Sequence, residues 1–488
     1  MKKGPFLFGG NIAASLLCIA IALSCLLPSV AHAGRIEAGT FVAHDTLGTN
    51  RTPDFVSFQQ TFDTPPIVII LPSQTGANSA TVTVQNVTTT GFDELIVEPD
   101  NWDGRHLAMT VHYVAVEPGR HVLPDGQIIE AGLHSTTTVQ FGTGFTGGTT
   151  GWDTVNFSSS LPNTPTILHH LQTTNSETSN VANAASRPHI TSIAQSPSLT
   201  GFQLAIDRSQ ANSGPFPSTE VIGWIAFPSG GSGDFPNTAG TAIDWSATTT
   251  GFNIRGWDDG CTANPTGIST GTSIVVAKKL SRRNDDGGWL RYCAISSNSV
   301  TLRVDEDRDQ DTERNIAAGD AERAAIVAFS QAFHANLAAD LTTSKVKFST
   351  SGTYADFELP GALVEYQINV TNEGNAPPNY DTVEVTDALP RELALVVTDF
   401  AAPGSGPVQF TDGSPATTLT CPFVSLANTG DCIAFSIDGS DFSYVPTDSG
   451  DGTDPAVTHI RVTPTGAMRG DTGSGDPNFE LRLRARIK

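Results

Sequence analysis

Internal repetition constrains this sequence more than any other feature. Three apolar segments of similar length match one another, namely Val111–Val116, Val221–Phe227 and Arg323–Phe329. The last two are each preceded by a glutamate, at Glu220 and Glu322. Repetition at about one hundred residues indicates tandem copies of one supersecondary unit.

The start of each unit carries a second, weaker repeat. Glu37-Ala38-Gly39 recurs as Glu130-Ala131-Gly132 and, less clearly, as Thr238-Ala239-Gly240. With 488 residues the chain is also too long for a single core. The predicted units are 34–128, 129–236 and 237–340, followed by an unrelated fourth unit over 341–488.

Composition predicts that these units are made of strands. Gly (46) and Pro (30) are frequent and only 16% of residues are charged, so turns are abundant and long helical patterns are scarce. Each unit has room for six or seven short strands, which predicts an all-β chain of tandem antiparallel β-sandwiches.

In one segment the local helix propensity and the internal repeat predict different structures. Residues 317–340 are rich in alanine and would favour helix by propensity alone. The alignment with the two earlier units predicts that Ala324–Phe329 is nevertheless a strand. A helical turn over 331–341 is expected in the linker that follows.

The fourth unit contains a clear period-two pattern. In Leu363–Thr371 the residues Val364, Tyr366, Ile368 and Val370 alternate with polar or exposed positions. Such alternation predicts a strand with one face buried.

The N-terminus has the pattern of a secretory signal peptide over residues 1–33. Lys2 and Lys3 precede an apolar run, and Ala31-His32-Ala33 predicts cleavage after Ala33. A weak lipobox around Cys25 is the alternative. Loss of the two lysines would change the net charge from −23 to −25. We expect an exported protein, extracellular, on the cell surface or periplasmic, without a membrane span after cleavage.

The strong negative charge argues against nucleic acid and against anionic membranes as partners. Four cysteines remain after cleavage, and export favours disulfides in two local pairs. The predicted pairs are Cys261 with Cys293 and Cys421 with Cys432. A zinc site is the rival interpretation, although no CxxC motif or nearby histidine supports it.

Residues 356–395 resemble the bacterial surface module known as domain of unknown function 11. The matching residues are Pro360-Gly361, Tyr366, Val370, Asn372, Gly374-Asn375, Val383, Val385, Asp387 and Leu389-Pro390. The resemblance implies an immunoglobulin-like sandwich that serves as a spacer or stalk. A long insertion around 421–432 departs from the usual module.

Residues 35–335 resemble the H-type-lectin-like repeats of large exported bacterial proteins of the MshQ type, which belong to a pilus system. The resemblance is carried by Asn86–Phe92, Val111–Gly119, His121, Leu123–Gly126 and Glu220–Ala226. It implies six-stranded sandwiches, and H-type lectins bind galactose-type sugars, often as trimers. Their sugar contacts do not map onto named positions here.

No catalytic motif is present: GxSxG, HExxH, a P-loop and a dinucleotide fingerprint are all missing from the sequence. His169 and His170 are adjacent in a strand-like segment, so their rings should point to opposite faces. They are therefore expected to be one surface and one core residue rather than a metal site.

Loop tryptophans among polar residues are candidates for sugar contact, because sugars stack on aromatic faces and hydrogen-bond to polar groups. The alternative is that each tryptophan closes the end of a sandwich. The candidate residues are Trp102, Asp103, Arg105, Trp257, Asp258 and Trp289. Trp224, in contrast, is expected in the core.

Alternating carboxylates over 305–313 suit calcium, which prefers hard oxygen ligands. The candidate ligands are Asp305, Asp307, Asp309 and Asp311. The spacing does not match an EF-hand, and an acidic loop with salt bridges to arginine is the alternative. No other cofactor is expected.

The leading functional hypothesis is a non-catalytic, exported, adhesin-like or pilus-associated protein that binds a surface glycan or an envelope protein. A structural spacer without a small ligand and a secreted glycan-active enzyme are the alternatives. Neither the ligand nor the oligomeric state follows from the sequence.

Overall fold

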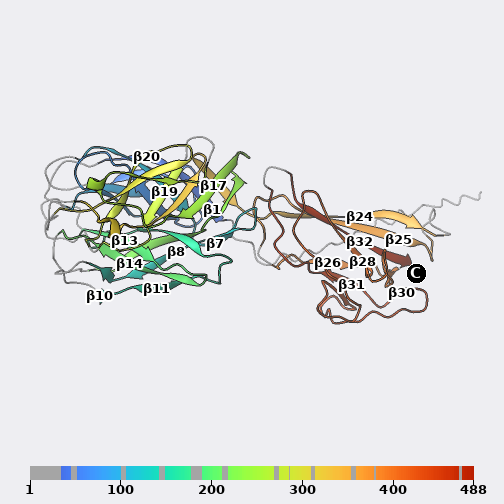
Figure 1. Ribbon diagram of the computed structural model, residues 1–488. Helices are drawn as coiled ribbons and strands as arrows, with labels where there is room; N and C mark the ends of the chain where they lie inside the picture. The colour runs from blue at the N-terminus through green and yellow to red at the C-terminus, as the bar shows by residue number, and fades with distance from the viewer. Residues whose placement is uncertain are drawn as a thin grey trace, which may run out of the picture.

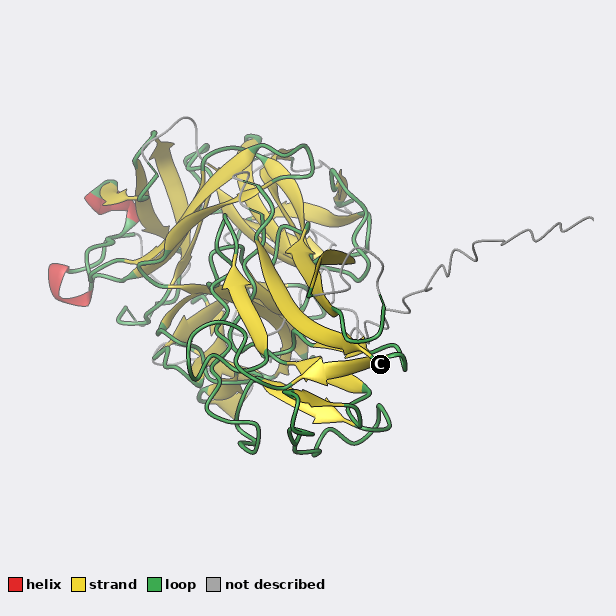
Figure 2. Ribbon diagram, turned by 90° about the vertical axis from the view of Figure 1, so that its right-hand side faces the viewer, coloured by secondary structure: helices red, strands yellow, loops and turns green. Residues whose placement is uncertain are grey.

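A computed structural model describes most of the chain, and strands dominate it (Figures 1 and 2). The described residues are 34–44, 52–99, 106–141, 149–176, 189–211, 218–268, 274–284, 286–308, 314–352, 359–378, 381–471 and 475–488. The predicted signal peptide and its cleavage site at Ala33 lie outside these ranges. Within them, no helix is long and apolar enough to cross a membrane.

The first unit is a sandwich of two antiparallel three-stranded sheets. One sheet has the order β1 (Gly34–Ala43), β6 (Met109–Val116) and β3 (Ile67–Pro72). The other has the order β2 (Asp54–Ser57), β5 (Gly91–Val97) and β4 (Thr81–Gln85). Buried side chains such as Phe62, Phe92 and Tyr113 fill the space between the two sheets.

The same strand order recurs twice. In the second unit, the first sheet has the order β8 (Ile128–Thr136), β15 (Glu220–Pro228) and β12 (Pro165–Leu171). Its second sheet has the order β11 (Asp153–Asn156), β14 (Gly201–Arg208) and β13 (Ile190–Gln195). In the third unit, the first sheet has the order β17 (Ala242–Thr249), β22 (Ala324–Phe329) and β19 (Ile274–Lys279). Its second sheet has the order β18 (Thr262–Pro265), β21 (Ser299–Asp305) and β20 (Trp289–Ile295). The second unit adds β9 (Thr138–Gln140), parallel to β14, and β10 (Thr149–Thr150). The predicted tandem sandwiches are confirmed, and so is the strand at Ala324–Phe329.

The three units form a closed ring, because the strand that follows each unit joins a sheet of the next one. After each unit a short strand pairs with the first strand of the next unit: β7 (Gly119–Val122) with β8, and β16 (Ser232–Pro236) with β17. After the third unit, β23 (Phe333–Leu337) returns to pair with β1 of the first. The predicted helical turn over 331–341 is therefore wrong. The segment is extended because β1 offers it an edge, and Phe333 packs 5.0 Å from the ring of Phe329.

Register shows where the third copy of the Glu-Ala-Gly repeat lies. Gly39 pairs with Tyr113 and Gly132 with Trp224, and the equivalent residue of the third unit, Thr248, pairs with Ile326. Ser246-Ala247-Thr248 is thus the structural counterpart. Thr238–Gly240 lies instead in the turn between β16 and β17, so the weak sequence match was wrong.

Strands β3, β12 and β19, one from each unit, contact one another pairwise and line the centre of the ring. One buried apolar cluster includes residues of all three units. Its polar links also cross between units. Gln172 of the second unit accepts a hydrogen bond from Val68 N (3.0 Å) and donates one to Val68 O (2.8 Å) in the first.

Two histidines join the third unit to its neighbours. His112 Nδ1 accepts a hydrogen bond from Val275 N at 3.1 Å. His169 Nε2 lies 2.7 Å from Lys279 O, and its Nδ1 lies 2.8 Å from Ser192 Oγ. His170 is buried as well. The expectation of one surface and one core histidine is wrong, because β13 of the same unit and strands of the neighbouring units together cover both faces of β12.

Ion pairs are also buried between units. Asp305 contacts Arg291 (2.7 Å) and Arg314 (2.9 Å), and the side chains of Asp305 and Arg291 are fully buried. Arg291 reaches into the first unit, where it donates to Ser73 O (2.9 Å) and Asn78 O (3.1 Å). A second pair, Lys279 with Asp207 at 2.9 Å, joins the third unit to the second.

The fourth sandwich lies beside the ring along the long axis of the molecule (Figure 1). Its larger sheet comprises β24 (Leu341–Ser351), β25 (Leu363–Asn372), β32 (Asn478–Ile487), β27 (Leu393–Val396), β30 (Thr453–Asp454) and β28 (Val408–Asp412). Its smaller sheet comprises β26 (Val385–Ala388), β31 (His459–Val462) and β29 (Ile433–Ser436). The predicted buried face of 363–371 is confirmed by burial of Val364, Tyr366, Ile368 and Val370.

A turn of the fourth sandwich holds the linker from the ring. The buried Asn372 accepts a hydrogen bond from Asp340 N at 3.0 Å, and Asn375 accepts one from Ala338 N at 3.0 Å. A Cβ on Gly374 would lie 2.3 Å from Ala338 O, so only glycine fits between them. Both predicted disulfides, Cys261–Cys293 and Cys421–Cys432, are confirmed.

Acid should loosen the ring, because its bridging histidines must stay neutral. Burial lowers the pKa of His112 to about 4 and that of His169 to about 3, below the ordinary 6.5. Their contribution to stability is present above pH 6.5 and is lost as the pH falls toward 4. We expect the melting temperature to fall over this range, and to fall less in His112→Gln. An equal fall in that variant would contradict the assignment to His112.

Breaking the Arg291–Asp305 pair should be costly, since it leaves a buried charge with one partner fewer. We expect Arg291→Met to lower the free energy of unfolding by about 3–5 kcal/mol, measured by urea denaturation. Replacing the exposed Arg391 by Met in the same way should leave the free energy of unfolding nearly unchanged. Arg291→Lys, which keeps a cation beside Asp305, should lose less stability than Arg291→Met, and an equal loss in both variants would contradict charge burial as the cause.

Candidate functional site

The structure places Trp257 against arginines rather than in open solvent. Trp257 begins the 3-10 turn η2 (Trp257–Asp259), and the guanidinium carbons of Arg303, Arg314 and Arg291 lie 3.2, 4.3 and 4.9 Å from its ring centroid. The carboxylate of Asp258 accepts a hydrogen bond from Arg314 N at 2.9 Å. These contacts give Trp257 and Asp258 a role in holding the third unit together.

Trp289 is buried where units meet. Its side chain is only 6% exposed, its Nε1 donates to Ala80 O of the first unit at 2.8 Å, and its ring lies 4.9 Å from His189 of the second. Its ring has no face open to a sugar. Trp224 is buried as predicted. The candidates Trp102, Asp103 and Arg105 lie outside the described residues.

The candidate calcium ligands do not form a common site among the described residues. Each oxygen of Asp305 contacts an arginine, so this carboxylate is already neutralised. Asp307 is buried and accepts a hydrogen bond from Gln210 N at 2.7 Å. Asp309 and Asp311 lie outside the described residues. The arrangement at Asp305 is the salt-bridged alternative to calcium.

A groove between the second and third units offers a better site for a ligand. It has a volume of about 760 Å³ and gathers segments that end or begin strands at the same edge of the ring. It is lined by Asn163, Thr164, Pro165, Gln195, Ser196, Pro197, Ser229, Thr249, Phe252, Leu280, Ser281, Arg282, Arg283 and Arg323. Three of these residues are arginines and none is acidic, in a chain of net charge −23.

An exposed aromatic ring lies at the centre of the positive charge. Phe252 is 46% exposed, and the guanidinium carbons of Arg283 and Arg323 lie 4.4 and 4.1 Å from its ring centroid. Arg282 is held by Asp207 at 2.9 Å. The groove therefore combines an apolar face, planar donors and nearby amides.

A buried glutamate shapes the loop that carries two of these arginines. Glu322 precedes β22, is fully buried, and accepts hydrogen bonds from Arg283 N (2.7 Å), Asn284 N (3.0 Å) and the hydroxyl of Ser281. Glu220 does the same for the corresponding loop of the second unit, through Asn175 N at 3.1 Å. The repeated glutamate noted in the sequence thus fixes the loop after the third strand of a unit.

No sequence pattern predicted this groove. Its residues come from both units and are separated by up to about 160 positions, and the available signal was the pair Arg282-Arg283 in an acidic chain. The groove forms only when the second and third units pack against each other, and the pattern of strands in the sequence does not predict that packing.

Comparison with known families gives one match. Residues 54–116, which run from β2 to β6 of the first unit, match the H-type lectin domain. No curated protein and no solved structure matches the chain. The match covers one of three sandwiches that share a strand order, and it supports the H-type-lectin part of the resemblance drawn from the sequence.

Removal of the Trp257 side chain should destabilise the third unit. An indole that packs against three guanidiniums contributes both apolar contact and cation–π attraction, so we expect Trp257→Ala to cost about 2–4 kcal/mol. Urea denaturation measures the change. Trp257→Phe should recover part of it, whereas no loss in either variant would show that the ring carries no structural role.

Proposed function

We propose that this protein is a non-catalytic carbohydrate-binding protein, and that it binds acidic glycans in the groove between its second and third units. The observation that carries the proposal is the arginine-lined groove around Phe252, with no carboxylate in its lining. The match of the first unit to the H-type lectin domain supports carbohydrate as the ligand class.

The chemistry of the groove favours uronic or sialic acid units over neutral sugars. Guanidinium groups bind carboxylates through two parallel hydrogen bonds, which adds geometric selectivity to charge. The apolar ring of Phe252 suits the hydrophobic face of a sugar ring, and Asn163 and Gln195 supply amides for its hydroxyl groups. The remaining acidic surface repels polyanions elsewhere on the protein.

The wider setting that we propose is an exported, adhesin-like protein, and it rests on the signal-peptide pattern of residues 1–33. In this setting the fourth sandwich is the stalk that carries the ring away from its attachment, in a cell envelope or a pilus. Its position beside the ring and the turn at Asn372 that holds the linker support this division of labour.

A glycan array followed by calorimetry on the mature chain tests the proposal. We expect binding to glycans with terminal uronic or sialic acids, at least tenfold weaker in Phe252→Ala and in Arg283→Gln, and weaker at high salt because charge pairing is screened. Half-exposed residues of this kind can be replaced at little cost to stability.

The control is Arg391→Gln, which removes an equal charge from an exposed site in the fourth sandwich. It should bind as the wild type does. Glycan binding that survives both groove variants would place the sugar site elsewhere. No binding to any glycan, together with tight association to an envelope protein, would favour the spacer hypothesis instead.

A further inference from the structure

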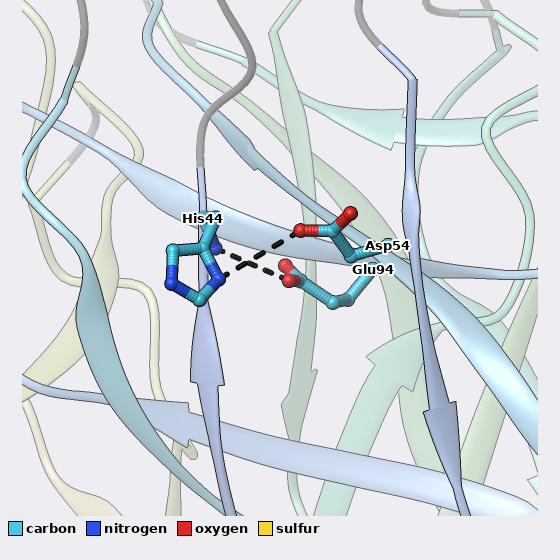
Figure 3. A group of neighbouring side chains, drawn as sticks. All are labelled: His44, Asp54 and Glu94. Atoms are coloured by element: carbon cyan, nitrogen blue, oxygen red, sulfur yellow. Dashed lines mark hydrogen bonds and ion pairs between the residues drawn. The ribbon is translucent and has the colours of Figure 1, made fainter.

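Three side chains of the first unit converge at one end of its sandwich, away from the glycan groove. His44 directly follows β1, Asp54 begins β2, and Glu94 lies in the middle of β5, where it pairs across the sheet with Asp54. One imidazole nitrogen and one oxygen from each carboxylate all lie within 4.8 Å of one another. Figure 3 shows the three groups facing a common space.

The contacts within the cluster leave part of it unsatisfied. His44 Nδ1 lies 3.7 Å from Asp54 Oδ2, and His44 N donates to Glu94 Oε1 at 3.2 Å. Glu94 is fully buried, yet its Oε2 has no hydrogen-bond partner among the described residues. A buried carboxylate oxygen without a partner is costly, and such groups call for an explanation.

No lysine or arginine of the described residues forms an ion pair with Glu94. The environment is therefore short of positive charge at the point where two carboxylates meet.

The sister units act as internal controls for this position. The residue that pairs with the start of the second strand is Glu94 in the first unit, Leu204 in the second and Leu302 in the third. The same backbone position thus accepts leucine twice, so the sandwich does not need a carboxylate there. The glutamate of the first unit replaces an apolar core residue at a cost in stability.

The second unit keeps the other carboxylate but satisfies it differently. Asp153 occupies the position of Asp54, and it receives His134 Nε2 at 2.8 Å, Thr136 Oγ1 at 2.5 Å and Thr138 Oγ1 at 2.7 Å. Both carboxylate oxygens of Asp153 therefore have hydrogen-bond partners. Among the described residues, the gathering of two carboxylates and a histidine occurs in the first unit alone.

We propose that His44, Asp54 and Glu94 form a binding site for a divalent transition-metal ion, Zn²⁺ in preference to Mn²⁺. An imidazole together with two carboxylates suits such ions, whereas calcium and magnesium select oxygen ligands only. Two carboxylates balance the charge of the ion. Three protein ligands leave a further coordination position for water.

The ion would join the two sheets of the sandwich. His44 extends from β1 of one sheet, and Asp54 and Glu94 belong to β2 and β5 of the other. A metal bound between them fixes the end of β1, which is also the strand that receives β23 and closes the ring. Metal binding should therefore stabilise the ring as well as the first unit.

The test uses the mature chain freed of metal by chelation and then titrated with ZnCl₂, MnCl₂, CaCl₂ or MgCl₂. We expect calorimetry to show one Zn²⁺ bound per chain, with a rise in melting temperature because the ion binds the folded state. Mn²⁺ should bind more weakly, and Ca²⁺ and Mg²⁺ should give no rise at the same concentration.

Glu94→Leu is the decisive variant, since leucine is the residue that both sister units carry at this position. It should fold, melt at a higher temperature than the metal-free wild type, and bind Zn²⁺ at least a hundredfold more weakly. Asp153→Asn in the second unit is the matched control and should keep the wild-type Zn²⁺ affinity and stoichiometry. Absence of a one-to-one Zn²⁺ complex in the wild type, or its survival in Glu94→Leu, would overturn the proposal.

Discussion

The pairing of β23 with β1 closes the ring and holds its three units together. It joins residues about three hundred positions apart and makes the third unit a neighbour of the first. A linear array of three sandwiches would leave one face of β3 and the edge of β1 open to solvent. Closure removes that edge, which β-sheet proteins must otherwise protect against pairing with other chains. The ring thus acts as a trimer made from one chain.

Covalent linkage of the copies has allowed them to diverge at their contacts. In a trimer of identical chains all three interfaces are the same. Here Gln172 joins the second unit to the first, His112 joins the first to the third, and His169 joins the second to the third. The three contacts use non-equivalent positions, since His112 lies on β6, whereas His169 lies on β12 and Gln172 directly follows it. The apolar core that surrounds them is continuous, so each polar group has to be fully paired.

The same divergence separates the sites that we propose. The glycan groove needs two adjacent units, because Phe252 and Arg283 belong to the third and Gln195 to the second. The cluster of His44, Asp54 and Glu94 lies within one unit and replaces a core leucine found in the other two. Tryptophans that looked like sugar platforms in the sequence serve the ring instead: Trp289 is covered by neighbouring units, and Trp257 packs against arginines.

Local sequence patterns predicted most of the strands, their repetition and the two disulfides. Period-two alternation predicted the buried face of β25, and the repeat alone was enough to predict a strand at Ala324–Phe329 against its helical propensity. Local patterns carry this information because a strand's own residues decide which of its faces is apolar. Local patterns do not predict which part of the chain covers that face. Tertiary structure alone closes the ring, buries His170 and brings residues 44, 54 and 94 together. Each of these features depends on contacts between segments that are distant in the chain.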